Sequence, residues 1–193
     1  MVAMRPSLIY LLGYPGVGKL TVARAIAQKS GAIVVDNQLI NLPIMTLFAW
    51  DGRAPLPPEI WSQISLIRHA VFETLANLTP RALSYVLTNV LEQTREGHEM
   101  FDWVASIAVR REAVFVPVLI TCELEEELRR VALAERAERL KTRDAAALRE
   151  YMSAHPLFIP DHPNVIHVDT TNLQPEDAAI AILTHVATVS GAD

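Results

Sequence analysis

The stretch that decides the fold is Gly13-Tyr14-Pro15-Gly16-Val17-Gly18-Lys19-Leu20-Thr21. An apolar run from Leu8 to Leu12 precedes it, and a helix-like run from Val22 to Ala27 follows it. Strand, glycine-rich loop, lysine and helix in this order hold the phosphates of a nucleotide, because the glycines let successive backbone N–H groups point into one concavity. Lys19 and the helix N-terminus add positive charge there. The alternative is an incidental glycine turn, and the flanking strand and helix favour the phosphate site.

Composition limits the class of protein. The 193 residues are 51% hydrophobic and 20% charged, which is typical of one soluble globular domain with a proper core. Charges or prolines interrupt every apolar run, so we expect neither a membrane span nor a signal peptide, and we expect a cytoplasmic location. The net charge of -5 argues against a nucleic-acid partner. The single cysteine, Cys122, excludes an internal disulfide and a cysteine-based zinc site.

Five short apolar runs alternate with segments long enough for helices. They span residues 8–12, 32–35, 83–87, 114–120 and 165–168. Their continuous apolarity is typical of strands buried on both faces, so we predict a three-layer α/β fold around a parallel sheet. Ligands of such sheets bind at the carboxyl ends of the strands, and the residues just after each strand are therefore the ones to examine for chemistry.

The motif Gly13-x-Pro15-Gly16-x-Gly18-Lys19-x-Thr21 resembles the phosphate loop of adenylate kinases and related small P-loop kinases. Shikimate kinase, gluconate kinase and chloramphenicol phosphotransferase belong to the same group. The rest of the chain is similar to these proteins only in the order and length of its strands. The resemblance implies a P-loop NTPase fold with strand order 2-3-1-4-5 and a single domain over residues 1–193. It also implies a helical acceptor-binding insertion at about 37–80 and a small lid at about 129–145.

The resemblance further implies that ATP and Mg²⁺ are the cofactors. Lys19 would contact the β- and γ-phosphates, and the Thr21 hydroxyl would contact a phosphate. The expected nucleotide-binding residues of the loop are Gly13, Pro15, Gly16, Val17, Gly18, Lys19, Leu20 and Thr21. Leu20 occupies the place where many P-loop proteins have a metal-binding hydroxyl. We therefore expect Mg²⁺ to be held mainly through phosphate and water, with Thr21 as a weak ligand.

Asp36 follows the second predicted strand. In shikimate kinase and chloramphenicol phosphotransferase an aspartate at this place binds the acceptor hydroxyl, so the resemblance makes Asp36 the candidate base or acceptor-positioning group. The alternative is that Asp36 or Asn37 caps a helix that begins near Gln38. The two roles are compatible.

The segment between the second and third strands predicts helices over residues 43–50 and 58–77. It carries Trp50 and Trp61, which either pack in the core or form a platform for the acceptor. After the third strand come Thr88 and Asn89, where the strongest ATP-hydrolysing members of the group place an aspartate. Together with Leu20, this departure favours slow turnover.

The segment after the fourth strand has acidic residues first and arginines later. This order suits the helix dipole and pairing between successive turns, which is the structural interpretation. In the kinase group the lid begins here. The resemblance therefore implies that Arg129 or Arg130 stacks on the adenine and that Arg136 and Arg139 reach the transferred phosphoryl group.

Residues 169–177 follow the fifth strand and include Thr170, Thr171, Asn172 and Pro175. In the small kinases this loop wraps the adenine, and Thr171 and Pro175 are the expected contacts. The alternative is a turn and a helix start with Pro175 at its first position.

The sequence therefore predicts an ATP-dependent phosphotransferase that acts on a small-molecule acceptor. Lys19, Asp36, Arg136 and Arg139 are the predicted catalytic residues. A nucleotide-binding protein with little or no turnover is the alternative, and a nucleic-acid end kinase is disfavoured by the net charge. The sequence indicates neither the acceptor nor the oligomeric state.

Overall fold

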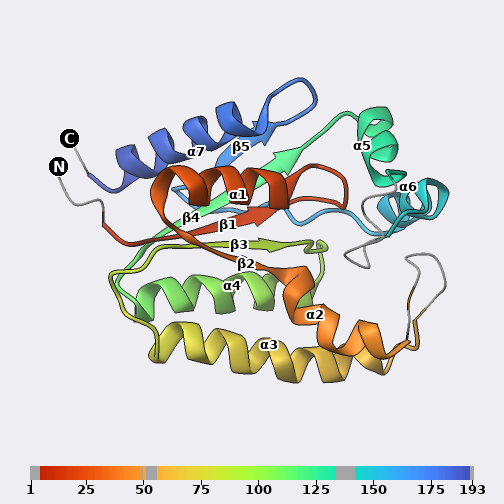
Figure 1. Ribbon diagram of the computed structural model, residues 1–193, viewed down its shortest axis with the longest axis horizontal. Helices are drawn as coiled ribbons and strands as arrows, with labels where there is room; N and C mark the ends of the chain where they lie inside the picture. The colour runs from red at the N-terminus through yellow and green to blue at the C-terminus, as the bar shows by residue number, and fades with distance from the viewer. Residues whose placement is uncertain (1–4, 49, 51–55, 134–141, 192–193) are drawn as a thin grey trace.

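The computed structural model describes residues 5–48, 50, 56–133 and 142–191. Five parallel strands form one sheet in the order β2-β3-β1-β4-β5, as the resemblance implied (Figure 1). The strands are β1 (Ser7–Leu12), β2 (Ile33–Asp36), β3 (Tyr85–Asn89), β4 (Val114–Thr121) and β5 (Ile166–Asp169). The predicted α/β fold with a parallel sheet is confirmed.

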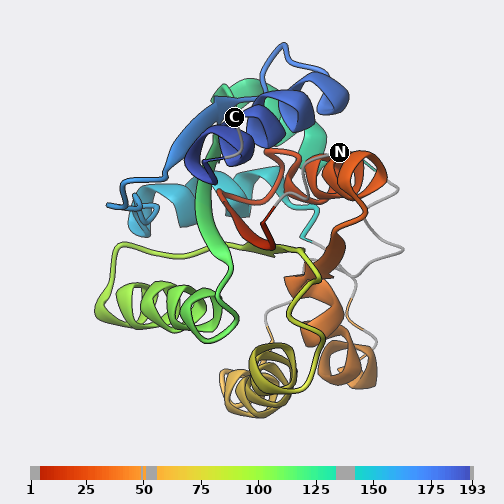
Figure 2. The ribbon, with the colours of Figure 1, turned by 90° about the vertical axis from the view of Figure 1, so that its left-hand side faces the viewer.

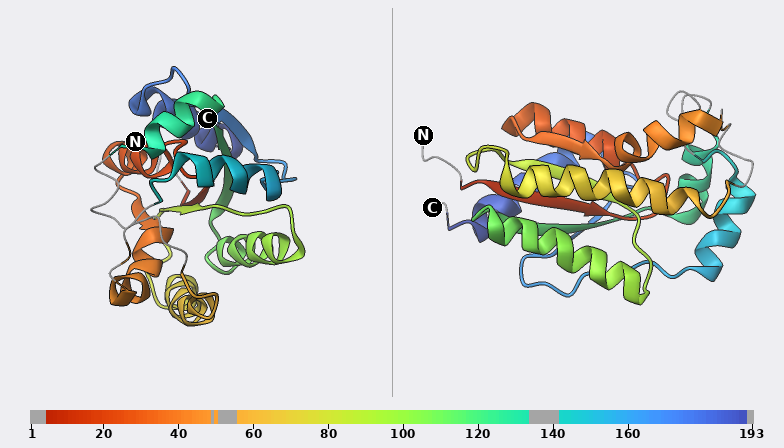
Figure 3. Two further views of the ribbon diagram at one scale, coloured as in Figure 1. Left: turned by 90° about the vertical axis from the view of Figure 1, so that its right-hand side faces the viewer. Right: turned by 90° about the horizontal axis from the view of Figure 1, so that it is seen from below.

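Helices cover both faces of this sheet. α1 (Lys19–Ser30) and α7 (Pro175–Val189) lie on one face, and α3 (Ile60–Asn77) and α4 (Arg95–Arg110) lie on the other (Figures 1 and 2). α2 (Asn37–Met45), α5 (Leu124–Val131) and α6 (Ala145–Ala154) lie toward the carboxyl ends of the strands (Figure 3). No helix of the described segments is both long and apolar enough to cross a bilayer.

The central strand β1 shows why its apolar run is continuous. Leu8, Tyr10 and Leu12 join the core cluster that includes residues of α3 and α4. Ile9 and Leu11 join the cluster that includes residues of α1 and α7. Since successive side chains of a strand point to opposite faces, a strand between two helical layers needs an apolar residue at every position.

The boundaries of β3 differ from the prediction. Thr88 and Asn89 are its last two residues and do not follow it. They pair in register with Leu11 and Leu12 of β1. The sheet therefore carries these polar residues to its carboxyl edge, where they are buried.

The predicted helix over residues 43–50 is wrong. The helix is α2, which contains Pro43 and is followed by a 3-10 turn, Thr46–Phe48. Proline is favoured in the first turn of a helix, but Pro43 lies inside α2. Here the start is determined by Asp36, which caps α2 and also accepts a hydrogen bond from Thr88 on the neighbouring strand.

Candidate active site

The loop between β1 and α1, residues 13–18 and hereafter the phosphate loop, is packed so closely that two of its glycines have no room for a side chain. A Cβ on Gly13 would lie 2.4 Å from the Ile120 carbonyl oxygen. Gly16 has φ 109°, and its Cβ would lie within 2.9 Å of atoms of both Glu127 and Val131 on α5. Glycine is therefore required at these two positions for two reasons: the backbone has a positive φ, and neighbouring atoms leave no space for a Cβ.

We expect Gly16→Ala to lower the free energy of unfolding by about 2–4 kcal/mol, because it adds a steric clash to the strain of a positive φ. It should also weaken nucleotide binding, since α5 or the loop must move. Gly31→Ala is the matched control, because Gly31 also has a positive φ, 75°, but has no atom within 4 Å of its Cβ position. Urea unfolding and titration with a fluorescent nucleotide would measure both effects. Equal destabilisation by the two substitutions would contradict the packing argument.

Lys19 begins α1, and its side chain folds back over the phosphate loop. Its Nζ donates to the carbonyl oxygens of Gly13 at 2.6 Å and Tyr14 at 2.7 Å. The ammonium group is therefore held beside the loop at the amino end of a helix, where a phosphate binds well.

Two side chains from distant parts of the chain support the phosphate loop. Thr170, after β5, donates its hydroxyl to the Val17 carbonyl at 2.8 Å. The Tyr14 hydroxyl donates to the carbonyl of His155, just after α6, at 2.7 Å. The loop is thus tied to both segments.

Asp36, only 4% exposed, ends β2 at the same edge of the sheet. Its Oδ1 accepts from the Thr88 hydroxyl at 2.8 Å and lies 3.5 Å from the Gln38 amide, which it caps. The helix-capping interpretation is therefore confirmed. The catalytic role is compatible with it and remains a prediction.

Thr88 and Asn89 form a polar floor at the end of β3. The Thr88 hydroxyl accepts from the Asn37 amide at 3.1 Å. The Asn89 side chain donates to the Tyr10 hydroxyl at 3.0 Å and accepts from the Val90 amide at 2.9 Å. Burial raises the pKa of Tyr10, so this partner stays neutral. Asn89 thus has a structural role at the position where the resemblance led us to expect an aspartate.

The oxygen donors in this region suit magnesium. Thr21, Asp36 and Thr88 line one cavity, and all three carry oxygen atoms, the ligand type that Mg²⁺ prefers. Only Asp36 carries a charge, and Mg²⁺ keeps several of its waters. The donor set therefore fits a metal held mainly through phosphate and water.

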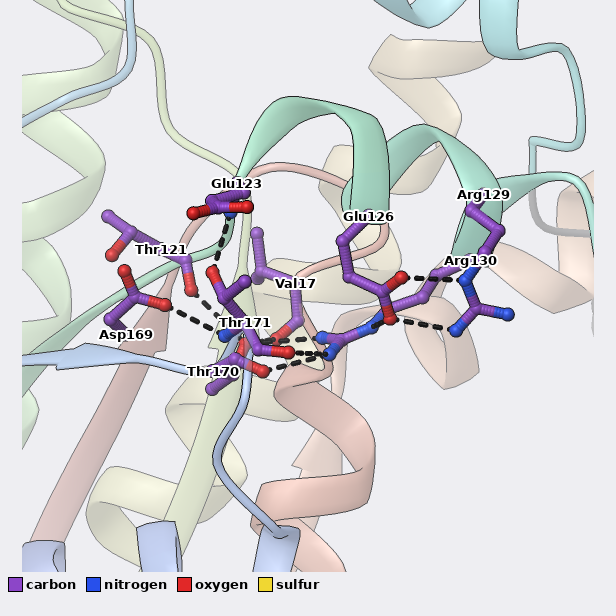
Figure 4. Close-up of polar contacts among 9 residues, drawn as sticks. All are labelled: Val17, Thr121, Glu123, Glu126, Arg129, Arg130, Asp169, Thr170 and Thr171. Carbon is purple, nitrogen blue, oxygen red and sulfur yellow. Dashed lines mark hydrogen bonds and ion pairs between the residues drawn. The ribbon is translucent and has the colours of Figure 1, made fainter.

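Arg130 on α5 connects this helix to the segment after β5 (Figure 4). Its Nε donates to Glu126 at 2.7 Å, and its Nη2 donates to the carbonyls of Thr170 at 2.8 Å and Thr171 at 3.2 Å. Arg129 instead forms an exposed double hydrogen bond with Glu126. Hydrogen bonds from Arg129 and Arg130 lower the pKa of Glu126 to about 2, so this carboxylate stays charged. The structural interpretation of the acidic and basic pairs is confirmed for these three residues.

Thr171 and Pro175 have structural roles too. The Thr171 hydroxyl accepts from the Glu123 amide at 2.8 Å, and its own amide donates to Asp169. Pro175 is at the first position of α7, as the structural interpretation predicted. Contact of either residue with adenine stays a prediction.

One cavity of about 580 Å³ collects most of the predicted site residues. Those in its lining are Pro15, Gly16, Gly18, Lys19, Leu20, Thr21, Asp36 and Arg130. Five further predicted site residues are described in the structure but are not part of this lining: Gly13, Val17, Arg129, Thr171 and Pro175. Arg136 and Arg139 lie outside the described residues.

Sequence reasoning missed several residues of this lining. They are Arg24, Asn41, Met45, Val90, Leu133 and Thr142. A usable signal existed for α2, because Asn37, Asn41 and Met45 are spaced by four residues and therefore share one helix face. The helix expected over residues 43–50 does not include Asn37 and Asn41, whereas the alternative of a helix that begins near Gln38 includes both Asn41 and Met45. Trp50 and Trp61 also line the cavity, and Trp50 packs against the core as well.

Comparison with solved structures identifies the fold. No family model matches the sequence, and a search of curated proteins finds no match either. A gluconokinase from Sinorhizobium meliloti 1021 has a TM-score of 0.62 and 15% identity over 97% of this chain and 95% of its own. A sugar kinase from Janibacter sp. HTCC2649 has a TM-score of 0.59 and 19% identity over 96% and 97%.

An APS kinase of Mycobacterium tuberculosis in complex with AMPPNP and APS has a TM-score of 0.58 and 17% identity over 94% of this chain and 98% of its own. These structures are similar along nearly their whole length. The chain therefore has the P-loop kinase-like fold.

Proposed function

We propose that this protein is an ATP-dependent phosphotransferase that moves the γ-phosphate of ATP to a small-molecule acceptor. The observation that carries the proposal is the shared cavity, in which Lys19 of the phosphate loop and Asp36 of β2 line the same space. A phosphate-binding group and a buried carboxylate that line one cavity suit the transfer of a phosphoryl group to a hydroxyl. The kinase-like fold supports this function, as does the similarity to solved structures of a sugar kinase, a gluconokinase and an APS kinase.

In this proposal each group has a defined role. The backbone amides of the phosphate loop and the Lys19 ammonium hold the phosphates and stabilise the charge that spreads over them during transfer. Asp36, oriented by its hydrogen bond from Thr88, accepts the proton of the acceptor hydroxyl. ATP with Mg²⁺ would supply the phosphoryl group and neutralise part of its charge. Most of the rate enhancement then comes from positioning and electrostatics.

The remaining residues divide between the two substrates. We assign Arg130 to the nucleotide side, and its position in the cavity lining beside the segment after β5 supports this assignment. We assign Arg129, Thr171 and Pro175 to the adenine side on the resemblance alone. Arg136 and Arg139 are proposed to reach the transferred phosphoryl group. On the acceptor side the lining residues come from α2 and from Trp50 and Trp61.

Lys19→Ala tests the phosphate side. We expect phosphoryl transfer to fall by about 10²–10³-fold, because a preorganised cation is removed from the transferred group. Lys29→Ala, in the last turn of the same helix and exposed, should retain the wild-type rate. Transfer to an acceptor found by screening sugars, nucleosides and hydroxy acids with radiolabelled ATP would measure the rate. Wild-type transfer by Lys19→Ala would refute the proposed site.

A nucleotide-binding protein with little turnover is the second candidate. Leu20 after the lysine and Asn89 in a structural hydrogen-bond pair favour it, because neither supplies a direct ligand for the metal. Single-turnover phosphate release from Mg·ATP separates the two functions. Tight nucleotide binding without release or transfer, with every acceptor of the screen, would favour the second candidate.

A further inference from the structure

Glu127 is a buried carboxylic acid directly behind the phosphate loop. It lies on α5, is 2% exposed, and its Cγ would lie 2.9 Å from a Cβ placed on Gly16. Among the described residues, its Oε1 finds no hydrogen-bond partner. A carboxyl group in such a place is costly as an anion, because burial removes this oxygen from bulk solvent and no donor among the described residues compensates its charge.

The titratable groups around Glu127 come from four parts of the chain, and two of them are charged. Lys19 at the start of α1 and Arg130 on α5 both favour the anion. Tyr14 of the phosphate loop and Cys122 after β4 lie within its field as neutral groups. Burial outweighs the two cations and raises the pKa of Glu127 to about 7. The carboxyl group is therefore close to the midpoint between its two forms at neutral pH.

A bound phosphate changes this balance in one direction. In this structure Lys19 donates to the loop carbonyls, and phosphate oxygens bound in the loop would attract its ammonium group. The phosphate would also add negative charge close to Glu127. Both effects disfavour the carboxylate and favour the carboxylic acid. No described residue needs to move far for this coupling, because Glu127 already contacts the loop at Gly16.

We propose that Glu127 is a proton-binding site coupled to the phosphate loop, so that binding of a nucleotide's phosphates shifts this carboxyl group toward its acid form and takes up part of a proton from solvent. The inference rests on the nucleotide binding of the proposed function and adds its regulation by pH. Because coupling between two ligands is reciprocal, protonated Glu127 binds nucleotide more tightly. Affinity is therefore highest below neutral pH and falls as pH rises above 7, by at most tenfold per pH unit for one proton.

Calorimetry measures this proton directly. Binding of ADP with Mg²⁺ is titrated at pH 7.5 in PIPES and in Tris, whose ionisation enthalpies differ, for wild type, Glu127→Gln and Glu125→Gln. Glu125 is the matched control, because it lies on the same helix, is exposed and pairs with Arg149. Protons released or bound by ADP itself are the same in all three proteins. We expect wild type and Glu125→Gln to take up more protons than Glu127→Gln, by a fraction of one proton, because part of the carboxyl group is already protonated before binding.

A second measurement follows affinity between pH 6.5 and 8.5. The ADP affinity of wild type should fall more steeply with pH than that of Glu127→Gln, and Glu127→Leu should behave like Glu127→Gln. Equal proton uptake and parallel pH profiles would overturn the role of Glu127 and leave the proposed function intact. Absence of ADP binding by every protein, wild type included, would overturn both.

Discussion

Asp36→Asn is expected to lower phosphoryl transfer by about 10²–10⁴-fold while nucleotide affinity stays within about twofold of wild type. The amide is isosteric with the carboxylate but takes no proton from an acceptor hydroxyl, and removal of a general base has effects of this size. Fold and helix should survive, because asparagine caps helices as well as aspartate does. Initial rates of transfer from radiolabelled ATP and a parallel nucleotide titration would measure the two effects.

Asp36→Ala separates the chemistry from the cap. It should lose transfer to the same extent and, in addition, about 1 kcal/mol of unfolding free energy, because α2 then has no capping side chain. Asp102→Asn, an exposed substitution on α4, is the control and should retain both properties. The catalytic assignment fails if Asp36→Asn transfers phosphate to the identified acceptor at the wild-type rate. A loss of stability without a loss of rate would leave Asp36 with its capping role alone.

Arg111→Met is expected to cause the largest loss of stability, about 3–5 kcal/mol. Arg111 follows α4, is 1% exposed and donates to the carbonyls of Leu75, Pro80 and Leu83 at 2.6–3.0 Å. These carbonyls surround the carboxyl end of α3, where a cation is favourable. Methionine fills the space but leaves the carbonyls buried without donors, each at a cost of about 1–3 kcal/mol.

Urea unfolding at pH 7 measures this loss, with thermal unfolding as a check; the midpoint temperature should fall by on the order of 10 °C. Arg110→Met is the matched control. Arg110 is the preceding residue, but its pair with Glu73 at 3.1 Å is about one-third exposed, so we expect a change below about 1 kcal/mol. Arg111→Lys should recover only part of the stability, because an ammonium group lacks the planar fork that reaches several carbonyls. Equal effects of Arg110→Met and Arg111→Met would refute this account of Arg111.

Much of the fold was predictable because its signals are local. The continuous apolar runs located all five strands to within about two residues, since a strand between two helical layers must be apolar throughout. The glycine pattern located the phosphate loop. Strand order came from the resemblance and is confirmed. The strand β3 ends two residues later than predicted. This small shift has a large consequence, because it makes Thr88 and Asn89 buried strand residues and not residues of the following loop.

Other features depend on partners that are distant in sequence. The start of α2 is linked to Thr88, 52 residues from Asp36 in the chain. Arg130 is held by carbonyls 40 and 41 residues away. An arginine just after a helix is ordinarily solvated, but Arg111 is buried. Its acceptors lie 28–36 residues earlier in the chain. Local patterns of charge and polarity carry no information on such pairs.

The sequence by itself determined the parallel α/β sheet, the phosphate loop and the choice of Asp36 as the residue to test. The sheet and the loop follow from backbone conformation and apolar patterning, which nearest neighbours in the chain specify, and the choice of Asp36 follows from its place after the second strand together with the resemblance. Only the tertiary structure decided that Asp36 and Lys19 share one cavity, that Arg130 connects α5 to the segment after β5, and that Glu127 is buried against Gly16. In the sequence Glu127 is the third of three consecutive glutamates. Packing of α5 against the phosphate loop removes this one from water, and burial is what changes the chemistry of a carboxyl group.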